Sequence, residues 1–134
     1  MDAKDFDNAQ FEALFELMVI AAAADDEIAK EEKEELFANF EALTAGKEGL
    51  GSFESSFAKA LGNLAVDGRD ARLASIKERL VSPTAREAAL VAAIRVFAVD
   101  GIVRTSEREA ILEIADALGI DSDHAADLVR DAAR

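Results

Sequence analysis

One pattern occurs twice in this chain, 75 residues apart, and it constrains the fold more than any other feature. The first copy begins at Asp25 and the second at Asp100, and each has an aliphatic residue three positions later. A glutamate follows the aspartate by seven positions in both copies, as Glu32 and as Glu107. Apolar segments with helical spacing flank each copy. The repeated unit is therefore a helix, an acidic turn and a second helix, and it predicts two equivalent helical hairpins.

Apolar residues recur at helical spacing along most of the chain, and no strong segment alternates as a half-buried strand would. The apolar fraction is 51%, and the eight Phe are the large core candidates. With one Pro and no Trp or Tyr, this composition favours helices over strands. The sequence predicts seven helices, over residues 8–24, 30–44, 52–64, 70–80, 83–98, 105–118 and 122–132.

Residues that commonly start or stop helices stand at several of these expected ends. The expected N-caps are Asp7, Ser82, Thr105 and Asp121. Pro83 suits the first helical position after the Ser82 cap, and Gly119 is expected to end the sixth helix.

The chain of 134 residues fits one compact domain, spanning residues 1–134. Short connections between the paired helices imply antiparallel packing within each hairpin. We therefore expect a single all-α bundle with approximate internal two-fold symmetry. Phe37 and Phe97 each fall on the inward stripe of their helix, so we expect both rings in the core.

The formal net charge is −13, and most of the acidic excess lies in the first 48 residues. This balance argues against direct binding to nucleic acid, which needs clustered Lys and Arg. It is compatible with cations or basic partners, and equally with a role in solubility. The absence of Cys removes disulfides and thiolate metal sites. Without a signal-peptide core or an apolar run near the ~20 residues of a membrane helix, we expect a cytoplasmic protein that does not insert into membranes.

The acidic turns have a structural and a functional interpretation. In the structural one, the Asp ends a helix and the Glu complements the positive end of the next helix dipole. In the functional one, Asp100, Val103 and Glu107 match the second half of a calcium-binding EF-hand loop. The first two ligand positions of that loop would be Val96 and Ala98, which cannot coordinate, so an ordinary EF-hand is rejected.

A cation site could still form if the two turns approach each other. Asp25, Glu32, Asp100 and Glu107 would then pool their carboxylates. Ligation by oxygen alone suits a hard divalent cation such as Ca²⁺ or Mg²⁺.

Catalysis finds little support in the sequence. The chain has no Cys, a single His at His124 and no Gly-rich phosphate loop. Pooled carboxylates could in principle serve a metal-dependent hydrolase, but nothing in the sequence marks a cleft. We expect a protein that is not an enzyme.

The two turns and one further segment resemble the tellurite-resistance TerB family. The segments that carry this resemblance are 24–28 with Glu32, 99–103 with Glu107, and 115–120. The family's turn reads Ala-Asp-Gly, a hydrophobic residue and then Glu; the first copy departs from it with Asp26 at the Gly position. The resemblance covers roughly residues 10 to 130. It implies an all-α bundle, a cytoplasmic stress-response or metal-resistance role and an acidic metal-binding surface, and a relation to the N-terminal domain of DjlA-like co-chaperones.

We therefore expect a module that binds a divalent cation, a partner protein or both through its acidic turns. The alternative is a protein-interaction domain, such as a co-chaperone or an adaptor of a membrane-associated complex, in which the turns are purely structural. Stabilisation by a metal ion would separate the two.

Overall fold

A computed structural model describes residues 5–24, 28–45, 49–98 and 105–132. Within these ranges the chain forms seven α-helices and no strand, so the predicted all-α fold is confirmed. The helices are α1 (Asn8–Ala22), α2 (Lys30–Thr44), α3 (Phe53–Asp67), α4 (Arg69–Arg79), α5 (Pro83–Phe97), α6 (Thr105–Ala117) and α7 (Ser122–Ala132). In the described part of the chain, none of these helices combines the length and the apolar character that crossing a membrane requires.

Local side-chain chemistry sets several helix ends where the sequence predicts them. The Asp7 carboxylate accepts a hydrogen bond from the Gln10 backbone N–H at 2.8 Å and so caps α1. Ser82 caps α5 in the same way, with Pro83 at the first helical position. After α6, Gly119 takes a φ of +77°, a left-handed conformation that favours glycine at helix ends. The helix α6 begins at Thr105 itself.

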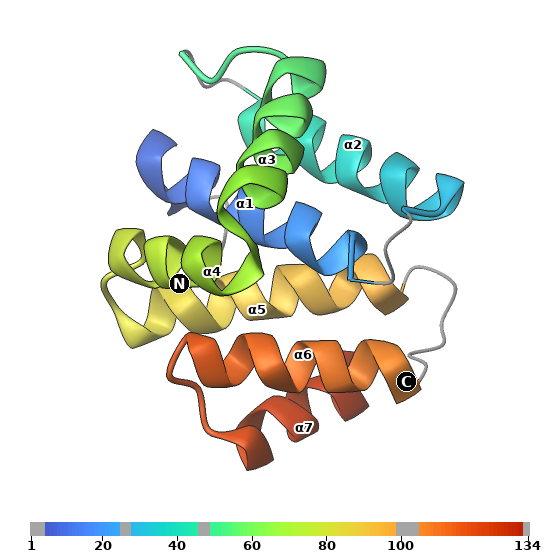
Figure 1. Ribbon diagram of the computed structural model, residues 1–134, viewed down its shortest axis with the longest axis vertical. Coiled ribbons are helices and arrows are strands. Elements are labelled where there is room, and N and C mark those ends of the chain that lie inside the picture. Colours follow the sequence, from blue (N-terminus) through green and yellow to red (C-terminus); the bar gives the residue numbers. More distant parts are fainter. Residues whose placement is uncertain (1–4, 25–27, 46–48, 99–104, 133–134) are drawn as a thin grey trace.

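The helix α1 forms the centre of the bundle (Figure 1). It contacts α2, α3, α4 and α5, and its most extensive packing is against α5. Eleven of its 15 residues are buried, which is why this segment is apolar on nearly all sides rather than along one stripe. The helices α6 and α7 pack below α5, so the core continues from α1 through α5 to α6.

The first helices of the two expected hairpins, α1 and α5, pack against each other at the centre of the bundle. In Figure 1 the chain runs from left to right in α1 and α5 and from right to left in α2 and α6. Each hairpin is therefore antiparallel, and α2 and α6 lie on opposite sides of the central pair. The starts of α2 and α6 lie toward the same end of the bundle. Close superposition of one hairpin on the other stays a prediction.

The Phe side chains concentrate between α1, α2 and α3. The Phe40 ring lies 5.2 Å from the Phe15 ring and 5.5 Å from the Phe11 ring, measured between ring centres. Phe53 joins this cluster from α3, with its ring centre 5.8 Å from that of Phe15. Aromatic pairs at these separations add stabilisation beyond the area that they bury.

Of the two rings expected in the core, one is buried and the other is not. Phe97 is 2% exposed, which confirms the expectation for α5. The expectation for Phe37 is wrong, because this ring is 47% exposed. The helix α2 lies at the edge of the bundle and fully buries only Leu36 and Phe40. Phe37 is therefore at the margin of that narrow stripe, where it packs edge-to-face with Phe53, with the ring centres 5.2 Å apart.

Candidate functional site

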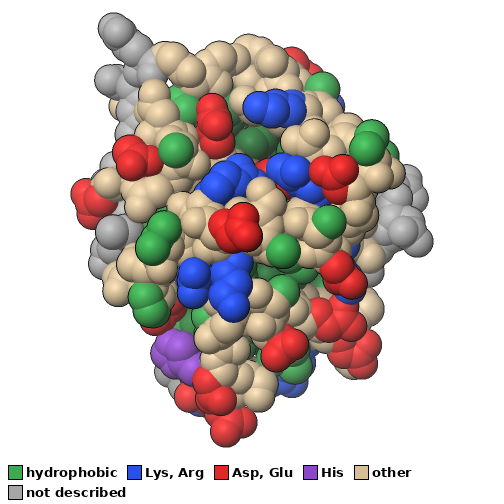
Figure 2. Space-filling view, turned by 60° about the vertical axis from the view of Figure 1, so that its left-hand side comes forward, with side chains coloured by type: hydrophobic (Ala, Val, Ile, Leu, Met, Phe, Trp, Pro, Cys, Tyr) green, Lys and Arg blue, Asp and Glu red, His purple; other side chains and the backbone are tan. Residues whose placement is uncertain are grey.

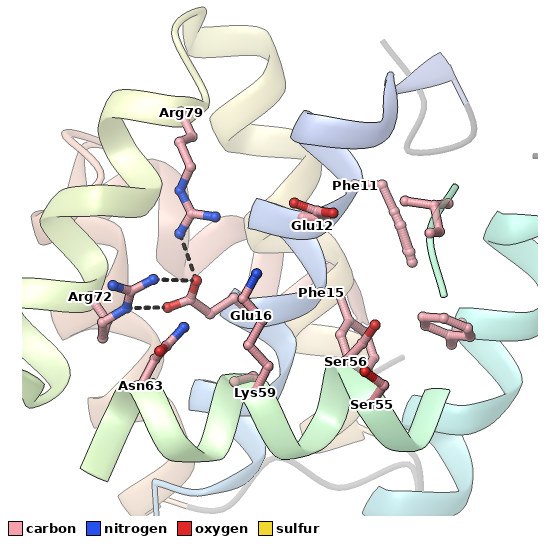
Figure 3. A pocket seen from close by; sticks show the side chains of 13 residues that line it. Phe11, Glu12, Phe15, Glu16, Ser55, Ser56, Lys59, Asn63, Arg72 and Arg79 are labelled. Atoms are coloured by element: carbon pink, nitrogen blue, oxygen red, sulfur yellow. Dashed lines mark hydrogen bonds and ion pairs between the residues drawn. The ribbon is translucent and has the colours of Figure 1, made fainter. Parts of the chain in front are cut away.

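A pocket of about 210 Å³ opens between α1, α3 and α4 (Figure 3). One side of the pocket is mainly apolar and is formed by Phe11, Phe15, Phe40, Leu50 and Ala60. The other side is polar and charged, with Glu12, Glu16, Lys59, Asn63, Arg72 and Arg79. Ser55 and Ser56 complete the wall on α3. The pocket thus offers an apolar surface beside a set of charged groups.

The charged side is built around Glu16, a carboxylate that is only 5% exposed within α1. Arg72 donates two hydrogen bonds to it, from Nε to Oε2 at 2.6 Å and from Nη2 to Oε1 at 2.9 Å. Arg79 donates a third, from Nη2 to Oε1 at 2.6 Å. Because Arg72 and Arg79 are seven residues apart on α4, they lie on one face of that helix, two turns apart. Both guanidinium groups therefore reach the same carboxylate.

The two arginines keep this buried carboxylate ionised. Burial alone would raise the pKa of Glu16, but the hydrogen bonds and charges of Arg72 and Arg79 outweigh it and hold the pKa below its ordinary value. The hydrogen bond to Glu16 in turn raises the pKa of Arg72, although burial opposes that shift. Arg72 also donates from Nη1 to Asp67 Oδ2 at 3.1 Å. The charges of Glu16 and Arg72 are thus held in a fixed arrangement at the pocket wall.

Lys59 is the third cation of the pocket, beside Arg72 and Arg79. Its side chain extends from α3 across the pocket toward α1 (Figure 3). Within the described ranges, neither Lys59 nor Asn63 makes a side-chain hydrogen bond or an ion pair. The lining holds the cations Lys59, Arg72 and Arg79 against the acids Glu12 and Glu16. The lining residues alone sum to one positive charge, and Asp67, the second partner of Arg72, balances it.

The surface around α4 carries several Lys and Arg side chains. Figure 2 shows Lys and Arg side chains gathered near the middle of the face that lies to the left in Figure 1, with Asp and Glu side chains among them and around them.

The structure describes two of the four carboxylates that the sequence predicts as cation ligands. Glu32 lies in the first turn of α2, where its Oε1 accepts a hydrogen bond from the Ala29 backbone N–H at 3.0 Å. Glu107 lies in the first turn of α6 and is 4% exposed. Asp25 and Asp100 lie outside the described residues. Among the residues that are described, no three acidic or histidine side chains come together as a group that could hold a metal ion.

The Glu16 cluster is the feature that sequence reasoning missed. Its partners lie 56 and 63 residues further along the chain. A signal was present, because Glu16 interrupts the apolar run of α1 at a position that faces the interior. A buried acid at such a position requires a cationic partner, and two arginines spaced by two helical turns are suitable candidates.

No protein-family model, curated protein or solved structure matches this chain. Its function is therefore inferred from its own residues and their arrangement.

Proposed function

We propose that this chain is a non-enzymatic binding module of the TerB type, with a cytoplasmic role in stress response or metal resistance. Its ligand is a divalent cation held by the acidic turns that connect α1 to α2 and α5 to α6. The observation that carries the proposal is the matched placement of Glu32 and Glu107. Each lies in the first turn of the second helix of its hairpin, and those helix starts lie toward the same end of the bundle (Figure 1).

Glu107 is 4% exposed, so its carboxylate is held in a fixed place at the start of α6, and it already has an interaction partner in the chain. A cation would be a further partner of this carboxylate, which offers about four acceptor positions. Glu32 Oε1 accepts the hydrogen bond that caps α2, and a carboxylate offers about four acceptor positions. The structural role of Glu32 is therefore compatible with ligation.

The non-enzymatic part of the proposal rests on the scarcity of nucleophile–base pairs. The single histidine, His124, places Nε2 3.1 Å from Glu87 Oε1, and both side chains are about half exposed. Neither residue lines the pocket described above.

The test is thermal unfolding of the full chain in rising Ca²⁺ or Mg²⁺, at constant ionic strength. A cation that binds only the folded state stabilises it by about 1.4 kcal/mol at ten times its Kd. We expect the melting temperature to rise with either ion and the rise to disappear in Asp25→Asn with Asp100→Asn. These changes preserve capping, because Asn caps as well as Asp.

A matched control removes two exposed carboxylates elsewhere on the same hairpins, as Glu41→Gln on α2 with Asp116→Asn on α6. This variant should keep the full response to the cation. If millimolar Ca²⁺ and Mg²⁺ leave the melting temperature unchanged, or if the Asp25 and Asp100 variant responds like the wild type, the cation proposal is wrong.

Either of these contradicting results would favour a protein-interaction domain, for which the structure offers one specific observation. The large apolar side chains Phe37, Val66 and Val81 are exposed to 47%, 85% and 76%. Phe37 packs against Phe53 in the interface of α2 and α3, so a half-exposed aromatic surface lies on that side of the molecule.

A further inference from the structure

The helix α2 has a buried side and an outer side. Its buried side packs against α1, α3 and α5, and its outer side lies at the edge of the bundle (Figure 1). The outer side carries the exposed residues Glu34, Phe37, Ala38, Glu41 and Ala42. Their spacing places them on one continuous face of the helix, on which two acids stand one turn to either side of the Phe37 ring and Ala38.

We propose that this outer face docks a basic amphipathic helix of a partner protein. An apolar side chain of the partner lies against Phe37 and Ala38. Cationic side chains of the partner, one turn to either side of that apolar side chain, lie at Glu34 and Glu41. Docking of one helix on another is read through anchors at this kind of spacing.

Phe37 supplies the apolar contact. Its ring is 47% exposed, yet edge-to-face packing on Phe53, with ring centres 5.2 Å apart, holds it in place. A partner that covers a ring already held in place removes apolar area from water and loses little side-chain freedom. The small side chains of Ala38 and Ala42 leave room beside the ring, so the backbone of a partner helix can come close to α2.

The two acids supply the charged contacts. Glu34 and Glu41 are seven residues apart on α2, which is two turns and about 10 Å along the axis. Glu41 lies in the last turn of α2, where the helix dipole disfavours a carboxylate, and it makes no hydrogen bond or ion pair with the part of the chain that the structure describes. Glu34 pairs with Lys30 at 4.0 Å, but both side chains are largely exposed, so this pair contributes little. A cation of a partner can therefore pair with either acid.

The charge of the whole region favours a basic partner over a second copy of this chain. Residues 30–54 hold seven acids and three bases. One of those bases, Lys33, places Nζ over the Phe57 ring of α3, 5.2 Å from its centre. Pairing two copies through α2 would bring like charges together, whereas a basic helix offsets them and is attracted from a distance.

The test is titration of the full chain with a synthetic helical peptide of about 18 residues, followed by the backbone amide signals in NMR. The peptide consists of Ala and Gln, with lysines seven residues apart and a leucine between each pair of lysines. We expect saturable shifts centred on Phe37, Ala38 and Glu41, and weaker binding as NaCl is raised. A peptide with Glu in place of Lys should not bind, and one with Ser in place of Leu should bind about tenfold more weakly.

Two acids of α6 provide a matched control for the charged contacts. The variant Glu34→Gln with Glu41→Gln should weaken binding of the lysine peptide about fivefold and should leave the core undisturbed. The control Glu109→Gln with Asp116→Asn removes two exposed acids that have the same seven-residue spacing, and it should bind like the wild type.

An exposed valine provides the control for the apolar contact. Phe37→Ala should weaken binding of the lysine peptide about tenfold. Val81→Ala shortens a side chain that is 76% exposed in the connection between α4 and α5, and it should bind like the wild type.

The proposal is overturned if the lysine peptide gives no saturable shifts at millimolar concentration, if the shifts centre on another face, or if the glutamate peptide binds as well. It is also overturned if the Glu109 and Asp116 variant weakens binding as much as the Glu34 and Glu41 variant, because the attraction would then be general charge.

A dimer of the free chain in sedimentation equilibrium that Phe37→Ala dissociates would assign the face to a second copy, and it would likewise overturn the proposal. The cation proposal is unaffected by any of these results, since it concerns other residues and is read from melting in Ca²⁺ or Mg²⁺.

Discussion

At the scale of single residues, Glu16 is a buried charge whose ion pairs matter for stability. A carboxylate inside an apolar helix is unfavourable unless its charge is compensated, and here two guanidinium groups compensate it. Loss of one partner leaves a buried charge with incomplete compensation. The arrangement therefore couples α1 to α4 more strongly than an ion pair on the surface would.

The first prediction compares two arginines of α4. Arg72→Gln should lower the free energy of unfolding by about 3 kcal/mol, because Glu16 would keep only Arg79 as a charged partner. Arg69→Gln is the control, since Arg69 pairs with Glu113 at an exposed site, and it should cost less than about 1 kcal/mol. Urea unfolding measures both. Equal losses in the two variants would show that the Glu16 pair contributes no more than a surface pair.

The second prediction concerns acid. Because the folded-state pKa of Glu16 is lowered, the unfolded chain takes up a proton at this site at a higher pH than the folded protein does. Its contribution to stability is therefore complete above the ordinary Glu pKa of 4.5 and is lost as the pH falls through the folded pKa. The variant Glu16→Gln lacks this term.

The measurement is the difference in unfolding free energy between the wild type and Glu16→Gln across the acid range. The difference should be constant above the ordinary pKa and should shrink as the pH falls below it. A difference that grows toward low pH would mean that the folded state raises the pKa of Glu16.

At the scale of elements, the seven helices differ in how many sides they bury. The helix α1 is enclosed by four others, whereas α2 lies at the edge and fully buries two residues. A substitution of the same chemical type should therefore have different costs in central and peripheral helices.

The third prediction follows from that difference. Phe97→Ala in α5 should cost roughly 3–5 kcal/mol, the usual range for a fully buried ring. Phe37→Ala in α2 should cost roughly 1–2 kcal/mol, because the ring is 47% exposed and loses mainly its edge contact with Phe53. Thermal or urea unfolding checks the pair. A loss at Phe37 as large as that at Phe97 would contradict the peripheral position of α2.

At the scale of the whole molecule, the net charge of −13 is the dominant electrostatic property. Repulsion among the acidic side chains opposes the compact state, and salt screens it. The ion pairs around Glu16 are partly buried and are screened less.

The fourth prediction is that NaCl stabilises the protein. Raising the ionic strength from 0.01 M to 0.15 M shortens the screening length from about 30 Å to about 8 Å. We expect a gain of about 1 kcal/mol, or roughly 4 °C in melting temperature. The variant Glu41→Gln with Asp116→Asn should respond less, because it carries two fewer negative charges. A fall in melting temperature with salt would mean that attractive pairs outweigh the general repulsion.

The positions of the helices and most of their ends were readable from the sequence, because the signals for them are local. The end of α3 is an exception, since this helix continues to Asp67, three residues past the expected end. Spacing of apolar residues identifies a helix within a few turns, and caps such as Asp7 and Ser82 act on backbone groups three residues away. The repeat around Asp25 and Asp100 likewise predicted the antiparallel hairpins.

Only the tertiary structure decided which helices meet and how far each side chain is covered. Glu16 finds Arg72 and Arg79 because α4 packs against α1, a contact between segments more than 50 residues apart that no local spacing encodes. The pocket beside Lys59 and the exposure of Phe37 have the same origin. Each depends on how a helix packs against the rest of the bundle. The spacing of apolar residues defines which face of a helix is buried. It does not define which helix covers that face, or how far the covered area extends around it.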